Sequence, residues 1–302
     1  TERAIIPSER SVMNEKNDSN DQTRGVQRRD VLKGAAAAGV ALAAGSYAAP
    51  PLLAAGQSDL IRKENEKPGT RDWMLTNTRQ LPGKINKILP NGRCPWIEGY
   101  CSANSVRAGE TLQVMVSTNP VSSFKLEIFR TGYYGGDGGR LMRTFESVDG
   151  QTQPDPPVGE NYVRECNWKP SVEFEIPEDW LSGVYLGKLT AEKENLQSYV
   201  IFIIRDDRPC DLLFQCSDLT WSAYNRWPAD YSIYTPHEKG SSTTGVPSGT
   251  VSFDRPYGLF THPVNRLKKS GGSGEYLPWE FPLSFWMEQH GYDVSYISNI
   301  DT

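Results

Sequence analysis

The sequence has few of the residues that build the commonest catalytic and metal-binding motifs. Its 3 histidines, His237, His262 and His290, show neither His-x-x-x-His nor His-Glu-x-x-His spacing, which argues against a histidine-rich zinc centre. No Gly-x-Ser-x-Gly run is present, so there is no nucleophile elbow of a serine hydrolase. The 5 cysteines contain no Cys-x-x-Cys pair, which argues against a zinc site of that type. Any chemistry must rest on other side chains.

A surplus of positive charge is also absent. The chain has 32 Lys and Arg against 37 Asp and Glu, for a formal net charge of -5. Nucleic-acid binding normally needs a clustered basic surface, so no nucleic-acid partner is expected. No run reaches the roughly 18 strongly apolar residues of a membrane-spanning helix, so no span is expected apart from an export segment.

Residues 1 to 55 have the features of a bacterial export signal. Gln27-Arg-Arg-Asp-Val-Leu-Lys33 precedes a run of alanine and glycine, and Ser46-Tyr-Ala48 offers a small-residue cleavage site. Paired arginines before a weakly apolar core indicate the twin-arginine route, and hence a periplasmic or secreted protein. Met13 fits a true start, so the chain is expected to be open at its front.

Export changes how the cysteines are interpreted. An oxidising compartment would allow a Cys94–Cys101 or a Cys94–Cys166 disulfide. Free buried thiols are the alternative, and an odd number leaves at least one cysteine unpaired within a monomer. The sequence leaves both open.

Residues 56 to 93 are polar and predict a linker or arm, and residues 94 to 205 predict an immunoglobulin-like β-sandwich. Short runs that alternate polar and apolar residues, with turns between them, are typical of two antiparallel sheets. A glycine-rich stretch, 130 to 140, is expected to be a loop whose glycines take positive φ, with Tyr133 and Tyr134 packing it down. Tyr185 is a candidate tyrosine corner. The predicted strands cover residues 111–116, 124–129, 172–176, 183–189 and 198–204.

Residues 206 to 302 predict the start of an α/β domain. A strand at 211–215 with an apolar centre is expected to be buried on both faces. A helix follows near 278–290, with an apolar face of Leu283, Trp286 and Met287 and with Gly291 as its C-terminal cap, and then a strand at 292–297. Two strands cannot bury a sheet, so this domain is expected to be truncated in the chain.

Two tyrosines lie in dense polar and aromatic motifs. Tyr224 ends Ser217-Asp-Leu-Thr-Trp-Ser-Ala-Tyr224, and Tyr257 ends Ser252-Phe-Asp-Arg-Pro-Tyr257. Plain core or rim aromatics are the default interpretation. A deprotonated phenol, however, is a hard oxygen ligand that suits a trivalent metal. Beside Tyr257, Arg255 and Asp254 are expected to form a simple ion pair, and the loop 235–248 that joins the two motifs is typical of a functional segment.

These motifs, together with Leu126-Glu-Ile-Phe-Arg-Thr-Gly-Tyr-Tyr-Gly-Gly136 and Gly291-Tyr-Asp-Val-Ser-Tyr-Ile-Ser-Asn299, resemble the N,N-dimethylformamidase large-subunit (beta-subunit) family over about residues 97 to 302. The resemblance implies a glutamine-amidotransferase-like α/β domain after the sandwich. It also implies a mononuclear iron, expected as Fe(III), held by two tyrosines and one glutamate. By position, Tyr224 and Tyr257 are the two tyrosine ligands, and the glutamate is expected beyond residue 302.

The resemblance further implies hydrolysis of a C–N amide bond, with iron activating water and the substrate carbonyl. The expected partner is a small amide substrate, and a homo-oligomer or a small companion subunit remains open. Trp221 and Trp227 are expected to line a pocket or belong to the core. Without the third ligand, the chain alone is expected to be inactive.

Two other functions remain open from the sequence. The first is a non-catalytic secreted β-sandwich protein that binds a partner or a glycan. The second is a carbohydrate-active enzyme, which would need paired carboxylates at a cleft, with Asp218 and Asp254 as the motif-borne candidates.

Overall fold

The computed structural model describes residues 58–85, 89–90, 92–235, 249–259 and 270–302. These residues belong to one compact unit, Ala54–Thr302. The predicted export signal, residues 236–248 of the joining loop, His237 and His262 all lie outside the described residues.

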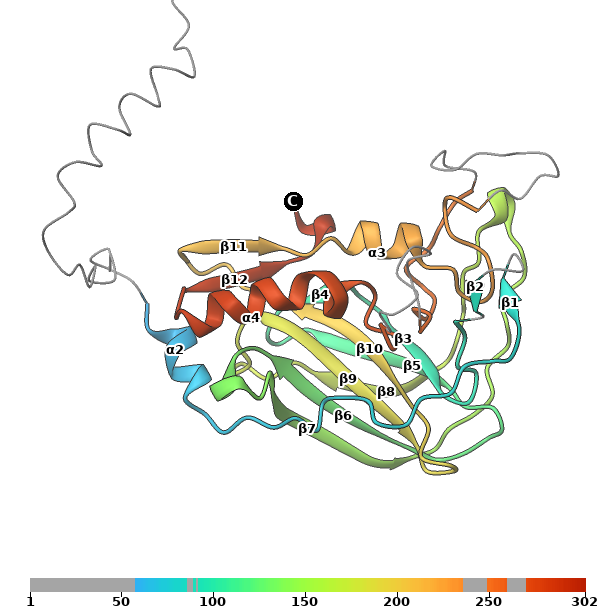
Figure 1. Ribbon diagram of the computed structural model, residues 1–302, viewed down its shortest axis with the longest axis horizontal. Coiled ribbons are helices and arrows are strands. Elements are labelled where there is room, and N and C mark those ends of the chain that lie inside the picture. Colours follow the sequence, from blue (N-terminus) through green and yellow to red (C-terminus); the bar gives the residue numbers. More distant parts are fainter. Residues whose placement is uncertain (1–57, 86–88, 91, 236–248, 260–269) are drawn as a thin grey trace, which may run out of the picture. The chain divides into compact units, whose positions relative to one another are not determined.

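The described chain is mainly β, with several sheets and few helices (Figure 1). A five-stranded sheet has the order β4-β10-β9-β6-β7, and a three-stranded sheet has the order β3-β5-β8. Neighbours are antiparallel except β4 and β10, which are parallel. The strands of the larger sheet are β4 Ser105–Val106, β6 Phe124–Thr131, β7 Gly139–Val148, β9 Gly183–Ala191 and β10 Gln197–Ile204. Those of the smaller sheet are β3 Glu98–Cys101, β5 Thr111–Ser117 and β8 Pro170–Glu175.

The strands predicted from alternation between residues 111 and 204 are all present, with small shifts at their ends. Their apolar positions meet in one core between the two sheets. Leu112 and Val114 of β5 and Leu126 of β6 belong to it and are almost fully buried. Two sheets that share a core in this way form a sandwich of layers. Before β3, the short strands β1 Lys84–Ile85 and β2 Leu89–Pro90 pair with each other.

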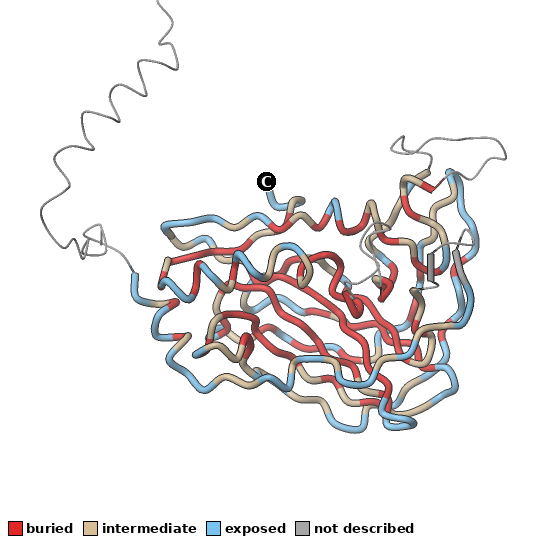
Figure 2. Tube along the Cα trace, viewed as in Figure 1, coloured by how far each residue is buried: buried red, intermediate tan, exposed pale blue. Residues whose placement is uncertain are grey.

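The other face of the five-stranded sheet is also covered. Leu186 of β9 and Ile201 of β10 pack in a second core with Met287, Val294 and Tyr296 from the C-terminal part of the chain. Every residue of β10 is therefore buried. Figure 2 shows the buried residues gathered along these central strands.

The C-terminal part contains two parallel strands, as predicted. β11 Leu212–Gln215 pairs with β12 Val294–Ile297, and the helices α3 Asp218–Tyr224 and α4 Phe281–Gln289 lie between them in sequence. Turns of π-helix, η3 Tyr276–Glu280, lead into α4, and the 3-10 turn η4 Asn299–Asp301 follows β12. The prediction that the first strand is buried on both faces is wrong. Leu213 is 60% exposed and Leu212, which points to the opposite face, is 38% exposed, so the described residues leave both faces of β11 partly uncovered.

Of the three residues of the predicted apolar face of helix α4, only Met287 is buried. Leu283 and Trp286 are about half exposed, while Ser284, Met287 and Glu288 are buried. The apolar-face rule failed because the buried polar side chains have partners: Ser284 is hydrogen-bonded to Tyr276, and Glu288 to a cation. The predicted cap is confirmed. Gly291 has φ of 72° and its N–H donates to the carbonyl of Glu288.

Two local predictions within the sandwich are also confirmed. Tyr185 donates its hydroxyl to the carbonyl of Leu181 at 2.7 Å, as a tyrosine corner should. In the glycine-rich loop, which contains the 3-10 turn η1 Tyr134–Gly136, three glycines take positive φ. Tyr133 there contacts the ring of Phe285 in α4. After β7 a further 3-10 turn, η2, spans Glu160–Tyr162.

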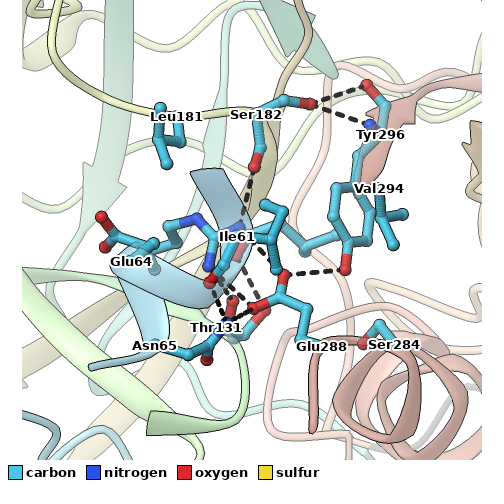
Figure 3. Close-up of polar contacts among 12 residues, drawn as sticks. Ile61, Glu64, Asn65, Thr131, Leu181, Ser182, Ser284, Glu288, Val294 and Tyr296 are labelled. Atoms are coloured by element: carbon cyan, nitrogen blue, oxygen red, sulfur yellow. Dashed lines mark hydrogen bonds and ion pairs between the residues drawn. The ribbon is translucent and has the colours of Figure 1, made fainter. Parts of the chain in front are cut away.

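A fully buried ion pair joins the sandwich to α4. Arg130 of β6 donates from Nη1 and Nη2 to the two carboxylate oxygens of Glu288, at 3.1 and 2.9 Å, and both side chains are 0% exposed. Glu288 also accepts from Tyr296 and from Asn65 (Figure 3). Burying a charge is costly unless it is paired and hydrogen-bonded, and both oxygens of this carboxylate meet that condition.

The segment expected to be a linker or arm contributes to the same cluster. Its helix α2, Leu60–Asn65, buries Ile61 and Glu64. Glu64 accepts from Tyr134 and from Arg140, both at 2.8 Å. The described part of this segment is therefore packed against the sandwich.

All 5 cysteines are free thiols, so neither candidate disulfide forms. Cys94, Cys101, Cys166 and Cys216 are buried, and Cys210 is partly exposed. Among the residues that the structure describes, no helix is long and apolar enough to cross a membrane.

Candidate functional site

The candidate site begins at the ends of the two parallel strands. Asp218 opens α3 directly after β11, and its buried carboxylate accepts from the backbone N–H of Asn299 at 2.7 Å and from the hydroxyl of Ser298. It also accepts from Asn104 of the sandwich at 2.6 Å. Asp218 thus links the ends of both strands to the sandwich and anchors the start of α3.

Tyr224 is the last residue of α3 and is partly buried. Its ring packs against Tyr234, with centroids 4.9 Å apart. The side chain borders a hollow of about 350 Å³, which suits a small ligand. The other residues that line this hollow are Ser217, Thr220, Trp221, Glu275, Trp279 and Glu280.

Tyr257 packs against Trp221. The two rings meet edge to face with centroids 6.5 Å apart, and Trp221 is one helical turn before Tyr224. Burial raises the pKa of the Tyr257 phenol, and the neighbouring charge of Asp218 adds to that shift. Among the described residues, none forms a hydrogen bond with the phenolic oxygen of Tyr257.

The backbone of the Tyr257 segment is held by a buried arginine. Arg255 is 1% exposed and, within the described chain, forms no ion pair with Asp254 or another carboxylate. The prediction of an ion pair is therefore wrong. Instead, the guanidinium donates to backbone carbonyls on both sides of the site, and burial lowers the pKa of Arg255 to about 10. The carbonyls belong to Ser222, Asn225, Trp227, Tyr231 and Ser252.

Asn225 connects the two tyrosine motifs directly. It follows Tyr224 in sequence, and its side-chain amide donates to the carbonyl of Pro256 at 2.9 Å. Its side-chain oxygen accepts from the N–H of Gly258 at 3.2 Å. The residues before and after Tyr257 are therefore both bonded to the residue after Tyr224. The structure brings the two motifs together, although Tyr257 comes 32 positions after Asn225 in sequence.

Glu280 is a carboxylate that the sequence motifs did not reveal. It accepts from the indole N–H of Trp221 at 2.7 Å and from the backbone N–H of Ser217. Burial raises its pKa. Since Glu280 is 59 residues from Trp221 in sequence, only the folded chain shows the pairing. The sole signal in the sequence was its position at the start of the predicted helix.

The other residues considered from the sequence, Trp227 and His290, contact groups that stabilise the fold. Trp227 is buried beside Trp168, and its indole donates to Glu98 at 2.9 Å, so it belongs to a core cluster. His290 is exposed, and its Nδ1 lies 2.8 Å from the carbonyl of Trp286 at the end of α4. In the described residues, no group of three or more His, Cys, Asp or Glu could hold a metal ion. A metal at this site would therefore need the tyrosine oxygens.

A family profile described as N,N-dimethylformamidase beta subunit-like, C-terminal matches residues 125–302, which is more than half of the chain. No curated protein matches the sequence. The match covers most of the five-stranded sheet and the whole candidate site. The chain belongs to the N,N-dimethylformamidase beta subunit-like family.

Proposed function

We propose that this protein is an exported, metal-dependent hydrolase that cleaves the C–N bond of a small amide. Family membership suggests an amidase-related function. The finer assignments are part of the proposal: an immunoglobulin-like sandwich, an amidotransferase-like α/β domain, the twin-arginine route and a ferric ion held by Tyr224 and Tyr257. The third ligand would be a glutamate, as the family resemblance implies.

The surroundings of Tyr257 support this proposal most strongly. Tyr257 is partly buried and packs against Trp221, which also lines the hollow beside Tyr224. Asn225 holds this tyrosine's segment against the end of α3, where Tyr224 lies. Phenol and carboxylate oxygens are hard donors that suit a trivalent ion. The residues present therefore fit the metal that the family implies.

Each part of the site has a defined task in the proposed reaction. The bound ion would polarise the amide carbonyl and acidify water. The hollow beside Tyr224 would hold the substrate, with the aromatic rings of Trp221 and Trp279 against its alkyl groups. Amide and water are converted into a carboxylic acid and an amine.

Replacement of each tyrosine by phenylalanine tests the proposal. Tyr224→Phe and Tyr257→Phe should each lower iron retention at least about 10-fold, because each removes a ligand oxygen. The free energy of unfolding should change by only about 1 kcal/mol. The measurements are iron per chain, the tyrosinate-to-iron absorption band and release of amine from small amides.

Tyr292→Phe is the matched control, since Tyr292 is also partly buried and packs on Trp286 in the same part of the chain. It should keep the iron and the absorption band. Equal iron content in wild type and both ligand variants would refute the assignment. A colourless, iron-free wild type would instead favour the non-catalytic binding protein.

A further inference from the structure

Buried side-chain contacts join the segment that ends at Tyr224 to the segment that contains Tyr257. The two tyrosines are 33 positions apart in sequence, so chain connectivity alone does not set their relative position. The contacts that join the two segments therefore have to fix the distance between the phenols.

Asn225 makes the most direct of these contacts. Its side chain is 1% exposed, and both its donor and its acceptor are used across the junction, to Pro256 and Gly258. The same oxygen accepts from the N–H of Trp227, which holds the amide group in one orientation. An amide with this many fixed partners has no freedom to shift one segment relative to the other.

Arg255 strengthens the junction from the opposite segment. Its guanidinium donates to the carbonyls of Ser222 and Asn225 at the end of α3, at 3.1 and 3.2 Å. The planar fork of an arginine reaches several acceptors at once, which a lysine ammonium cannot reproduce. Each segment thus contributes one buried side chain that holds the backbone of the other.

We propose that Asn225 is a positioning residue for the metal site, and that its bonds to Pro256 and Gly258 set the spacing of Tyr224 and Tyr257. This inference rests on the proposed function and deepens it. Residues that orient ligands without touching a metal typically change its affinity about 10- to 100-fold when they are replaced. A purely structural asparagine would change stability and leave the iron affinity of the folded protein unaltered.

The test uses Asn225→Ala, which loses both bonds, and Asn225→Asp, which keeps the acceptor for Gly258 and loses the donor to Pro256. Iron affinity should fall about 10-fold or more in the alanine variant and by a smaller factor in the aspartate variant. The tyrosinate-to-iron band should shift in both. The control is Asn77→Ala, because the Asn77 side chain also bonds to two backbone carbonyls, of Glu194 and Asn195, but on the surface.

A second measurement needs no metal. In protein labelled with 3-fluorotyrosine, the fluorine resonances of Tyr224 and Tyr257, assigned from the phenylalanine variants, should both move in the Asn225 variants and stay in place in Asn77→Ala. Unaltered resonances and unaltered iron affinity in a folded variant would overturn the inference. A third outcome is that the resonances move in the Asn225 variants while the wild-type protein binds no iron. That result would support the positioning role of Asn225 and refute the metal function. If Asn225→Ala does not fold, the same two measurements on Asn225→Asp decide between these outcomes.

Discussion

Arg130 and Glu288 leave water completely when the chain folds, and each satisfies the charge of the other. The space for this pair comes from glycine. A Cβ at Gly132 would overlap the Glu288 carboxylate, and one at Gly183 would come within 2.9 Å of Arg130 Nε. The backbone at Gly132 and Gly183 therefore leaves room for this ion pair, and a larger residue at either position would disturb it.

Removing one member should be far more damaging than removing both. Glu288→Leu should lower the free energy of unfolding by about 3–5 kcal/mol, because it leaves the guanidinium buried without a carboxylate. Arg130→Met with Glu288→Leu should recover much of that loss. Chemical denaturation of the wild type, the two single variants Arg130→Met and Glu288→Leu, and the double variant measures the effect. A double variant as unstable as the sum of both single variants would contradict the pairing argument.

At the scale of single residues, the sequence could reveal only part of the candidate site. Tyr224 and Tyr257 could be chosen as candidates from the sequence because they end recognisable motifs. Asn225 and Glu280 were not, because their role consists of contacts with residues far away in sequence. Arg255 was assigned to its neighbour Asp254, whereas its actual partners are backbone carbonyls, which no sequence pattern displays.

At the scale of elements, alternation identified the strands but not the number of layers. In β10, Val200 and Phe202 face the core between the sheets, while Tyr199 and Ile201 face the second core. Period-two patterns assume one wet face, so they cannot show that both faces are covered. For the same reason, the amphipathic rule chose the wrong side of α4, where the buried Glu288 is paired.

Helix α2 offers a test that depends on pH. Burial opposes ionisation of Glu64, but hydrogen bonds from Lys67 and Tyr134 and the charges of Arg130 and Arg140 outweigh it, so its pKa lies below the usual 4.5. A carboxyl with a lowered folded-state pKa stabilises the fold above its unfolded pKa and loses that contribution as pH falls through the folded value.

Glu64→Gln should therefore destabilise the protein near neutral pH, and the difference from wild type should shrink below about pH 4.5. Unfolding in denaturant across this pH range measures it. Glu66→Gln is the control, since Glu66 is an exposed neighbour. A difference that stays constant or widens as pH falls would show that the charge of Glu64 is not what stabilises α2.

At the scale of the whole molecule, the fold protects its thiols. Burial raises the pKa of Cys94 to about 11 and that of Cys101 to about 12. Because the thiolate is the reactive form, these cysteines should react slowly. A thiol-reactive dye should label Cys210 quickly in the native protein and all 5 cysteines after denaturation. Rapid labelling of a second thiol in the native state would show that a core opens.

The strand β10 has no outward side, and this constrains how the protein can change over generations. Most strands have positions that drift without harm because they meet only solvent. Along Gln197–Ile204 every substitution must suit either the sandwich or the layer that carries the tyrosines. Sequence variation in one half of the molecule is thereby coupled to the other, through a strand that belongs to both.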